Sequence, residues 1–364
     1  MSDPQLNVLL LADRFEVRGS STYTLRLARN LGEYGVRASV VSPDVQLVET
    51  DQRDPLSIAE YTHFCIPLWG RVVMRTLLND LKDDPPDLIH VQSRSMLSYG
   101  TRLARRLGRP LVMTVHDYLG PHERMRFHAR YGQRIIAVSE SVKSELLNRT
   151  RVSEGLITVI HGGVESACDQ QLPPVLDPGH VPVIGTAGPL EAAKGLPYFL
   201  GAVKRVLSVD ANVEFLISGT GPDEGNLRRL AQQLAIDEKV TFVPNLLDFS
   251  KSLAAMDVFC LPSLQQGFGT IMLEAMALAK PVIASGVGGV DSVIRDNETG
   301  LVVPPSESGP LADRIIELLR DPVRARAIGE AGRQLVHDEF GVEKMVRQTA
   351  DVYHDVLAGT DLAA

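Results

Sequence analysis

The chain has 364 residues, of which 44% are hydrophobic and 23% charged, close to the averages for soluble globular proteins. This composition excludes global disorder, and the length suits two domains. A formal net charge of −8 argues against a protein whose main task is to neutralise nucleic-acid phosphates, so no nucleic-acid partner is expected.

The three cysteines, Cys65, Cys168 and Cys260, lie far apart and form no Cys-x-x-Cys pair. We therefore expect neither a disulfide scaffold nor a zinc ribbon. The apolar run Leu6–Ala12 is too short for a signal peptide and lacks a basic lead-in. No segment approaches the about 18 apolar residues needed to cross a bilayer. We expect a soluble, cytoplasmic protein.

Short apolar runs alternate with helical stretches along residues 1–170, which we predict to form an N-terminal domain on the acceptor side. Leucines recur at helical spacing within Thr22–Tyr34, so that stretch is predicted to be a helix. Runs that are apolar on both faces, joined by helices, predict a parallel sheet covered on both sides. The expected strands are residues 7–12, 37–43, 87–92, 110–116 and 134–140.

A proline-rich segment at 171–182 interrupts this pattern. We predict a linker there, because proline neither continues a helix nor suits a central strand. Residues 1–180 carry equal numbers of basic and acidic side chains, so the whole charge of −8 falls on the rest of the chain. Residues 183–340 are predicted to form a second domain of the same kind. Its expected strands are residues 182–188, 213–219, 240–245, 258–263 and 281–285.

The predicted fold class is therefore α/β, with two Rossmann-like, doubly wound parallel-sheet domains that face each other across a cleft. Such domains hold ligands at the carboxyl ends of their strands. Residues 341–364 are predicted to form a C-terminal helix, and packing of this helix back onto the N-terminal domain is one option.

Two glycine-rich loops follow strands of the second domain. Gly219 and Gly221 stand where a strand gives way to a helix, and there backbone N–H groups and the helix dipole favour an anion. A tight turn without a ligand is the alternative. Lys194 lies in the other loop, between Gly188 and Gly195. Its ammonium is suited to neutralising a diphosphate, although a solvated lysine is the usual role.

A third constellation runs from residue 266 to residue 274. Gly267 and Gly269 free the backbone to approach a sugar closely, and Phe268 lies between them. Glu274 is expected to begin the helix that follows. Its alternative role is that of an acid favoured by the helix dipole.

Six stretches of the second domain stand out: GPLEAAKG, FLISGTGPDEGNLRRLAQQL, VTFVPN, DVFCLPSLQQGFGTIMLEAMALAKPVIAS, GVGGVDSVI and TGLVVPP. They closely resemble the second domain of the family four, or group 1, GT-B glycosyltransferases, which retain anomeric configuration. The first half is more loosely similar, through RGSSTYTLRLARNL, DLIHVQS, PLVMTVHDY, AVSESVKSELL and VIHGGVE. The run from Pro262 to Pro281 is the most specific part of the resemblance.

The resemblance implies a nucleotide-diphosphate sugar as donor. It implies that Lys194 holds the diphosphate and that Glu274 contacts the nucleotide ribose. Gly267, Phe268 and Gly269 would orient the donor sugar through their backbone. The base would be read near residues 244–247, largely by backbone groups.

This sequence departs from the family pattern at three positions of the donor-binding loops. Gln266 stands where the family has its first acid, so it can hydrogen-bond a sugar but cannot carry negative charge. Pro189 replaces a diphosphate-binding arginine. Arg18 replaces the first glycine of a loop whose second glycine, Gly19, approaches the donor diphosphate. We hypothesise that Arg18 supplies the cation missing at 189, and a solvent-exposed arginine is the alternative.

His116 ends a predicted strand, and its family counterpart bonds the donor sugar or orients the acceptor. Asp117 is suited to fixing its tautomer or to capping the next turn. His90 also ends a strand but lacks the family's following histidine, because Gln92 stands there. We therefore assign His90 a structural role and assign His116, Lys194 and Glu274 to catalysis.

Four arginines after the third predicted strand are spaced as one face of a helix: Arg102, Arg105, Arg106 and Arg109. They suit peripheral contact with anionic lipid headgroups at the inner face of a membrane, or with a lipid-phosphate-linked acceptor. A solvated face is the alternative, and it is favoured because arginine is the usual cation of this chain.

No Asp-x-Asp motif and no metal-ligand spacing occurs in the sequence, so no metal and no cofactor is expected. The sequence predicts a metal-independent, retaining glycosyltransferase that acts on a hydroxyl acceptor, which is a sugar, a glycolipid or a lipid-linked molecule, in polysaccharide or glycolipid assembly. Two alternatives stay open: a catalytically silent nucleotide-sugar-binding protein, and another GT-B reaction such as epimerisation or phosphorolysis.

Overall fold

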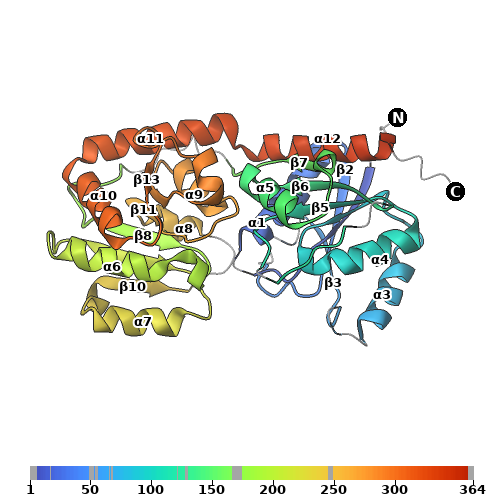
Figure 1. Cartoon of the computed structure of the whole chain (residues 1–364), viewed down its shortest axis with the longest axis horizontal. Coiled ribbons are helices and arrows are strands. Elements are labelled where there is room, and N and C mark those ends of the chain that lie inside the picture. The colour runs from blue at the N-terminus through green and yellow to red at the C-terminus, as the bar shows by residue number, and fades with distance from the viewer. Residues whose placement is uncertain are drawn as a thin grey trace. The chain divides into compact units, whose positions relative to one another are not determined.

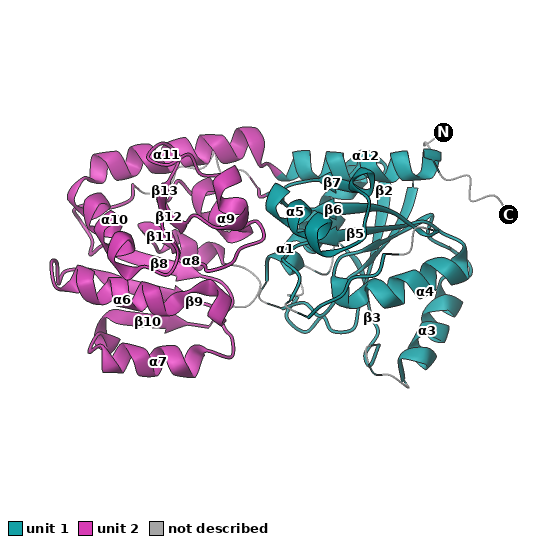
Figure 2. Ribbon diagram, viewed as in Figure 1, with its two compact units in different colours: residues 1–163, 342–364 teal, residues 164–341 magenta. Residues whose placement is uncertain are grey.

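The computed structural model describes residues 6–16, 18–48, 53, 56–64, 66, 69–120, 122–127, 130–165, 174–244 and 249–359. The chain divides into two compact units (Figure 2). Unit 1 comprises residues 1–163 and 342–364, and unit 2 comprises residues 164–341. Cys65 and Cys168 lie outside the described residues, and Cys260 is a buried free thiol.

Unit 1 is built on a seven-stranded sheet with the order β3-β2-β1-β4-β5-β6-β7, in which all strand pairs are parallel. Its strands are β1 (Leu6–Leu11), β2 (Val36–Ser42), β3 (Ser57–Glu60), β4 (Leu88–Val91), β5 (Leu111–Val115), β6 (Gly132–Ala137) and β7 (Ile157–Val159). Its helices are α1 (Gly19–Asn30), α3 (Trp69–Asp80), α4 (Leu97–Leu107), α5 (Glu140–Arg149) and α12 (Val342–Gly359).

Unit 2 is built on a six-stranded parallel sheet with the order β10-β9-β8-β11-β12-β13. Its strands are β8 (Val183–Ala187), β9 (Glu214–Ser218), β10 (Val240–Val243), β11 (Val258–Leu261), β12 (Val282–Ser285) and β13 (Leu301–Val303). Its helices are α6 (Leu196–Leu207), α7 (Glu224–Gln233), α8 (Ser250–Ala254), α9 (Thr270–Ala277), α10 (Ser308–Arg320) and α11 (Pro322–Glu339).

The prediction of two doubly wound parallel sheets is confirmed, and helices cover both faces of each sheet (Figure 1). Every residue of β4, β5, β11 and β12 is buried, because a central parallel strand packs against helices on both sides. All ten predicted strands are present. The short strands β3, β7 and β13 were not predicted; β3 is a largely exposed edge strand that carries no apolar run.

Two helix predictions need correction. The helix expected at Thr22–Tyr34 begins earlier, at Gly19, and after Asn30 its last residues form a 3₁₀ turn, Leu31–Tyr34. Helix α4 ends at Leu107, where Gly108 adopts a left-handed conformation with φ of 67°. Arg109 therefore lies beyond the helix and does not share a helical face with Arg102, Arg105 and Arg106.

The C-terminal helix α12 belongs to unit 1, where it packs against α1. Tyr353 of this helix is completely buried, and its hydroxyl oxygen lies 2.6 Å from Nδ1 of His90. Nε2 of the same histidine lies 2.8 Å from the hydroxyl oxygen of Thr114. The end of the chain thus meets β4 and β5 through a buried, hydrogen-bonded histidine, and His90 has the structural position that its sequence context predicted.

Residues 171–182 were predicted to be a linker. The structure describes this segment from residue 174 onward, and the segment belongs to unit 2. The buried carboxylate of Asp257 accepts hydrogen bonds from the backbone N–H groups of Leu176 and Val183, at 2.7 and 2.9 Å. Nε2 of His180 lies 2.9 Å from the same carboxylate. The division between the units falls after Gly163, inside the range 1–170 predicted for the first domain.

We expect Tyr353→Phe to lower the free energy of unfolding by about 1–3 kcal/mol, because a ring nitrogen of His90 would lose its partner while buried. Urea denaturation measures this loss. Tyr34→Phe is the matched control, since the Tyr34 hydroxyl makes an exposed bond to a carbonyl of the same helix α12, and its effect should stay within about 0.5 kcal/mol. Equal losses in the two variants would contradict the assignment.

Candidate functional site

A cavity of about 420 Å³ opens in unit 1 at the carboxyl ends of β1, β4 and β5. The chain runs outward from β1 to β3 and then returns to the other side of β1 to form β4, so this is the switch point of the sheet. Ligands of open α/β sheets bind in such crevices. The polar side chains lining it include those of Asp13, Arg14, Glu16, Arg18, Thr24, Gln92, Ser93, Arg94, Ser95, His116, Asp117 and Glu123.

The cavity brings together two of the predicted site residues, Arg18 and His116. Arg18 caps the N-terminus of α1 in an extended conformation, and Gly19 is the first residue of that helix. Nε of Arg18 lies 3.0 Å from the carboxylate of Glu16, and the Arg18 side chain is 43% exposed. The guanidinium is therefore reachable from the cavity, but it already has an acidic neighbour.

His116 is held as a neutral imidazole. Burial lowers its pKa from 6.5 to about 4, with the charge of Arg94 adding to the effect and that of Asp117 opposing it. The ring meets Tyr23 edge to face, with 4.8 Å between ring centroids. Among the described residues its buried Nε2 has no hydrogen-bond partner. A polar nitrogen without a partner beside a cavity is available to a hydroxyl group of a ligand.

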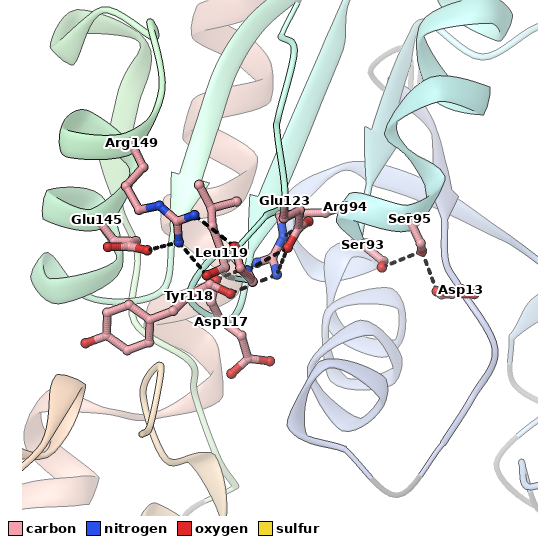
Figure 3. Close-up of polar contacts among 11 residues, drawn as sticks. Asp13, Ser93, Arg94, Ser95, Asp117, Tyr118, Leu119, Glu123, Glu145 and Arg149 are labelled. Atoms are coloured by element: carbon pink, nitrogen blue, oxygen red, sulfur yellow. Dashed lines mark hydrogen bonds and ion pairs between the residues drawn. The ribbon is translucent and has the colours of Figure 1, made fainter. Parts of the chain in front are cut away.

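Sequence reasoning missed the polar groups that shape this cavity (Figure 3). The hydroxyl of Ser95 bonds the carboxylate of Asp13 and lies 2.8 Å from the hydroxyl of Ser93. Arg94 donates to both carboxylate oxygens of Glu123, at 2.8 and 3.1 Å, and to the carbonyl of Tyr118 at 2.9 Å. Their position in the sequence was the available signal, because Asp13 comes shortly after β1, Ser93, Arg94 and Ser95 come shortly after β4, and Glu123 comes after β5.

The segment after β5 is fixed by two arginines rather than by its own secondary structure. Arg94 also donates to the carbonyl of Asp117, so Asp117 holds Arg94 through its backbone. Arg149 of α5 donates to the carbonyls of Leu119 and Gly120, at 2.7 and 2.8 Å (Figure 3). These bonds set the path of the chain that carries His116 out of the strand.

In unit 2 the loops after β8 and β11 lie at the switch point of the sheet, and the loop after β9 lies beside the loop after β8. The loop after β8 packs on the loop after β9, because Gly188 and Leu190 donate to the carbonyls of Ser218 and Thr220, at 2.9 and 3.0 Å. A Cβ on Gly219 would lie 1.9 Å from the carbonyl oxygen of Gly188, and φ of Gly219 is 148°. Only glycine allows this approach.

The role predicted for the Gly219 backbone therefore needs correction. Its N–H donates to the carbonyl of Val243, at 2.9 Å, and is not offered to a ligand. Gly221 is also constrained by packing, since a Cβ there would lie 2.4 Å from the carbonyl oxygen of Leu190. Within the described part of the chain, the N–H groups of Thr220 and Gly221 have no acceptor. They are the groups of this turn that an anion can reach.

Lys194 and Gln266 are brought together. Nζ of Lys194 donates to Oε1 of Gln266 at 3.0 Å, and the hydroxyl of Ser263 donates to the same oxygen at 3.1 Å. The two loops are also joined through their backbones, since Leu264 donates to the carbonyl of Ala193 at 2.9 Å. The amide accepts these bonds without cancelling the positive charge of the ammonium.

Glu274 was predicted to begin its helix, and this is wrong. Helix α9 starts at Thr270 with Gly269 as its cap, and Glu274 lies in the second turn. Glu274 is partly exposed, whereas Gly267, Phe268 and Gly269 are buried. A cavity of about 10 Å³ adjoins Lys194 and Pro189 and does not include Glu274. This cavity is too small for a sugar.

Three further predictions concern the base-reading segment, metal binding and membrane spans. Of the segment 244–247, predicted to read the base, residues 245–247 lie outside the described residues. Across the described ranges, no group of three or more His, Cys, Asp or Glu side chains is arranged to hold a metal ion. No helix in the same ranges is long and apolar enough to span a bilayer.

Comparison with protein families matches both halves of the chain in order. Residues 17–167 match the model described as "Glycosyltransferase Family 4", and residues 171–335 match "Glycosyl transferases group 1". The fold defines a two-unit α/β protein in which each unit is built on a Rossmann-like parallel sheet. More particularly, the chain belongs to the group 1 glycosyltransferases, which have the GT-B fold.

Two curated relatives match over part of their length. The chain is 36% identical over 154 residues to the N-acetyl-alpha-D-glucosaminyl L-malate synthase of Bacillus anthracis, covering 42% of this chain and 40% of the relative. It is 35% identical over 180 residues to a GDP-mannose-dependent phosphatidylinositol monomannoside mannosyltransferase of Corynebacterium glutamicum, covering 47% and 46%. The chain thus matches less than half the length of these two relatives.

Solved structures support the fold over the whole chain. HepE from Anabaena, in complex with UDP and glucose, superimposes with a TM-score of 0.81 at 20% identity, covering 96% of this chain and 100% of HepE. A glycosyltransferase from Rickettsia africae superimposes with a TM-score of 0.79 at 23% identity, covering 98% and 100%. Such low identities establish the fold and leave the substrates open.

The two buried histidines predict a pH dependence of stability. Burial lowers the pKa of His90 from 6.5 to about 3 and that of His116 to about 4. Below pH 6.5 the unfolded chain takes up protons that the folded chain does not, so stability falls as the pH falls from about 6.5 towards 4. Each histidine should contribute about 1.4 kcal/mol per pH unit in that window.

His90→Gln tests this expectation. The variant should lose less free energy of unfolding between pH 6 and pH 5 than the parent, by about 1.4 kcal/mol, in urea titrations at the two pH values. His122→Gln, at an exposed position of the same unit, should keep the parent's dependence. An unchanged slope in His90→Gln would show that the folded chain protonates His90 in this range.

Proposed function

We propose that this chain is a metal-independent, retaining glycosyltransferase that moves a sugar from a nucleotide-diphosphate donor to a hydroxyl acceptor in polysaccharide or glycolipid assembly. The observation that carries the proposal is the Lys194–Gln266 contact at the switch point of unit 2. It sets an ammonium beside loops that the family resemblance assigns to the donor, and family membership supports the class of reaction.

Donor binding would rest on unit 2. Lys194 would neutralise the diphosphate, and the N–H groups of Thr220 and Gly221 would add backbone dipoles. Glu274 would hold the ribose, and the buried loop of Gly267–Gly269 would orient the sugar. This arrangement needs no divalent ion, because fixed cationic and dipolar groups stabilise the leaving phosphate.

In unit 1, the neutral His116 would bond a hydroxyl group of a substrate. A neutral imidazole is able to bond a hydroxyl group without repelling the positive charge that develops on the sugar as the donor bond breaks. We favour a front-face route, in which the leaving phosphate receives the proton of the acceptor hydroxyl. Retention follows, since attack and departure occur on the same face of the sugar.

A second candidate is a nucleotide-sugar-binding protein without turnover. It is favoured by Gln266, whose oxygen already accepts from Lys194 and Ser263, and by Pro189 in place of a cation. Incubation with UDP-, GDP- and ADP-sugars, followed by assay for the free nucleotide, distinguishes the two. Slow donor hydrolysis supports the transferase, and tight binding without any hydrolysis or transfer supports the silent protein.

Lys194→Ala is expected to abolish stabilisation by the nucleoside diphosphate that binds. The parent should gain about 2.7 kcal/mol at a nucleotide concentration of a hundred times Kd, measured as a rise in Tm against uridine, guanosine and adenosine diphosphates. Lys204→Ala, at an exposed lysine of α6, is the control and should keep the full shift. A full shift in Lys194→Ala would remove Lys194 from the donor site.

Arg18→Ala tests the cation hypothesis. Loss of a charge-assisted hydrogen bond to the diphosphate should weaken donor affinity about tenfold, measured by calorimetry. Arg29→Ala, at the exposed far end of the same helix α1, should leave the affinity unchanged. If Arg18→Ala has no effect while Lys194→Ala abolishes binding, Arg18 does not replace the missing cation at 189.

A further inference from the structure

A second cavity in unit 1, of about 670 Å³, lies between α4 and the segment that precedes β6. Its volume is in the range of small-molecule sites. Its lining holds an unusual share of one residue type: of its residues, six are arginines and one is an acid. The arginines are Arg94, Arg102, Arg105, Arg124, Arg126 and Arg130.

The one acid of the lining does not offset this charge. Glu123 is bound by Arg94 through both of its carboxylate oxygens, and the bond from Arg94 holds the pKa of Glu123 below its usual value. These two side chains therefore neutralise each other. In the part of the chain that the structure describes, none of the other five arginines forms an ion pair with an acid.

The aromatic contacts of two of these arginines leave their hydrogen-bond donors free for a ligand. The guanidinium of Arg102 lies 5.8 Å from the ring centroid of Tyr99, and that of Arg130 lies 5.6 Å from the ring centroid of Tyr131. Such contacts hold a guanidinium by its face and orient it while its N–H groups remain available.

Only part of the arginine face expected from the sequence belongs to this cavity. Arg102 and Arg105 line it, whereas Arg106 does not, and Arg109 lies beyond the helix, 3.8 Å from Asp87. The remaining charge comes from Arg124, Arg126 and Arg130, which reach the cavity from another segment. Like charges gathered from two segments repel each other, and a bound anion removes this cost.

The cavity also has apolar walls. Leu97 is buried, and Met125 and Tyr131 are partly buried along the lining. Figure 3 shows the ion pair of Arg94 and Glu123. Both residues line this cavity and the cavity that contains His116, so the pair stands between the two. A ligand seated here is a neighbour of the cavity that contains His116.

We propose that this arginine cavity binds a phosphate ester carried by the acceptor. Guanidinium groups bind phosphate oxygens in pairs of parallel hydrogen bonds. Several arginines around one cavity suit a dianionic ester, which has three free oxygens, better than a single carboxylate. The apolar wall accommodates the carbon part of the ester. The identification of the ligand as the acceptor rests on the proposed transferase function, whereas the binding of a phosphate ester does not.

The test uses glycerol 3-phosphate as the probe and glycerol as its uncharged match, with calorimetry on the full chain. Glycerol 3-phosphate should bind and glycerol should not. The double variant Arg105→Gln and Arg130→Gln should bind glycerol 3-phosphate at least about tenfold more weakly. Arg106→Gln, at the exposed neighbour of Arg105 outside the cavity, is the matched control and should bind as the parent does.

A second arm identifies the source of the phosphate. Vesicles of phosphatidylcholine with and without phosphatidic acid, whose headgroup is a phosphate monoester, are sedimented with the parent chain. If phosphatidic acid vesicles bind and compete with glycerol 3-phosphate, the ester belongs to a lipid headgroup; if glycerol 3-phosphate binds and vesicles do not, the ester belongs to a water-soluble molecule. Both results support the cavity.

Three results would overturn the proposal: no binding of glycerol 3-phosphate, equal binding by the double variant, or binding to vesicles alone. Nucleoside diphosphates are measured on the same variants to keep the two proposals separate. The double variant should keep the nucleotide-dependent rise in Tm, and Lys194→Ala should lose that rise while still binding glycerol 3-phosphate. Failure of the glycerol 3-phosphate results overturns the arginine-cavity proposal alone, and failure of the nucleotide results overturns the donor-site proposal alone.

Discussion

The close packing of loops at the carboxyl edge of the second sheet is the constraint on which the candidate donor site depends. The chain after β8 approaches the chain after β9 so closely that Gly219 has no room for a Cβ. The same loop continues to Ala193, whose carbonyl accepts the N–H of Leu264. Lys194 is therefore positioned by backbone contacts on both sides, and its bond to Gln266 follows from them.

That geometry gives the substitution at position 266 a physical meaning. A carboxylate at 3.0 Å from the ammonium would form an ion pair and offset its charge, whereas the amide accepts a hydrogen bond and leaves the charge in place. The loss of a cation at Pro189 weakens the binding of a diphosphate, whereas an amide at 266 does not add a negative charge beside Lys194.

The first unit combines a rigid interior with two differently charged cavities. His90, buried and hydrogen-bonded to Tyr353 and Thr114, joins α12 to the strands that end at the switch point. The Arg94–Glu123 ion pair is partly exposed, so it contributes little to the free energy of unfolding. The pair matters because of where it lies in the unit. It separates a cavity of mixed polarity around His116 from one dominated by arginine.

The sequence by itself determined the fold class, the ten main strands and the loops that carry Lys194, Gln266 and His116. Apolar runs and helical spacing are local properties, and parallel sheets place the ends of their strands at one edge. Only the tertiary structure decided that α12 joins the first unit, that Gly219 serves packing, and that Arg102 and Arg105 meet arginines from a separate segment. Local periodicity shows which face of an element is polar, but the partner of that face depends on where a distant segment returns to the sheet.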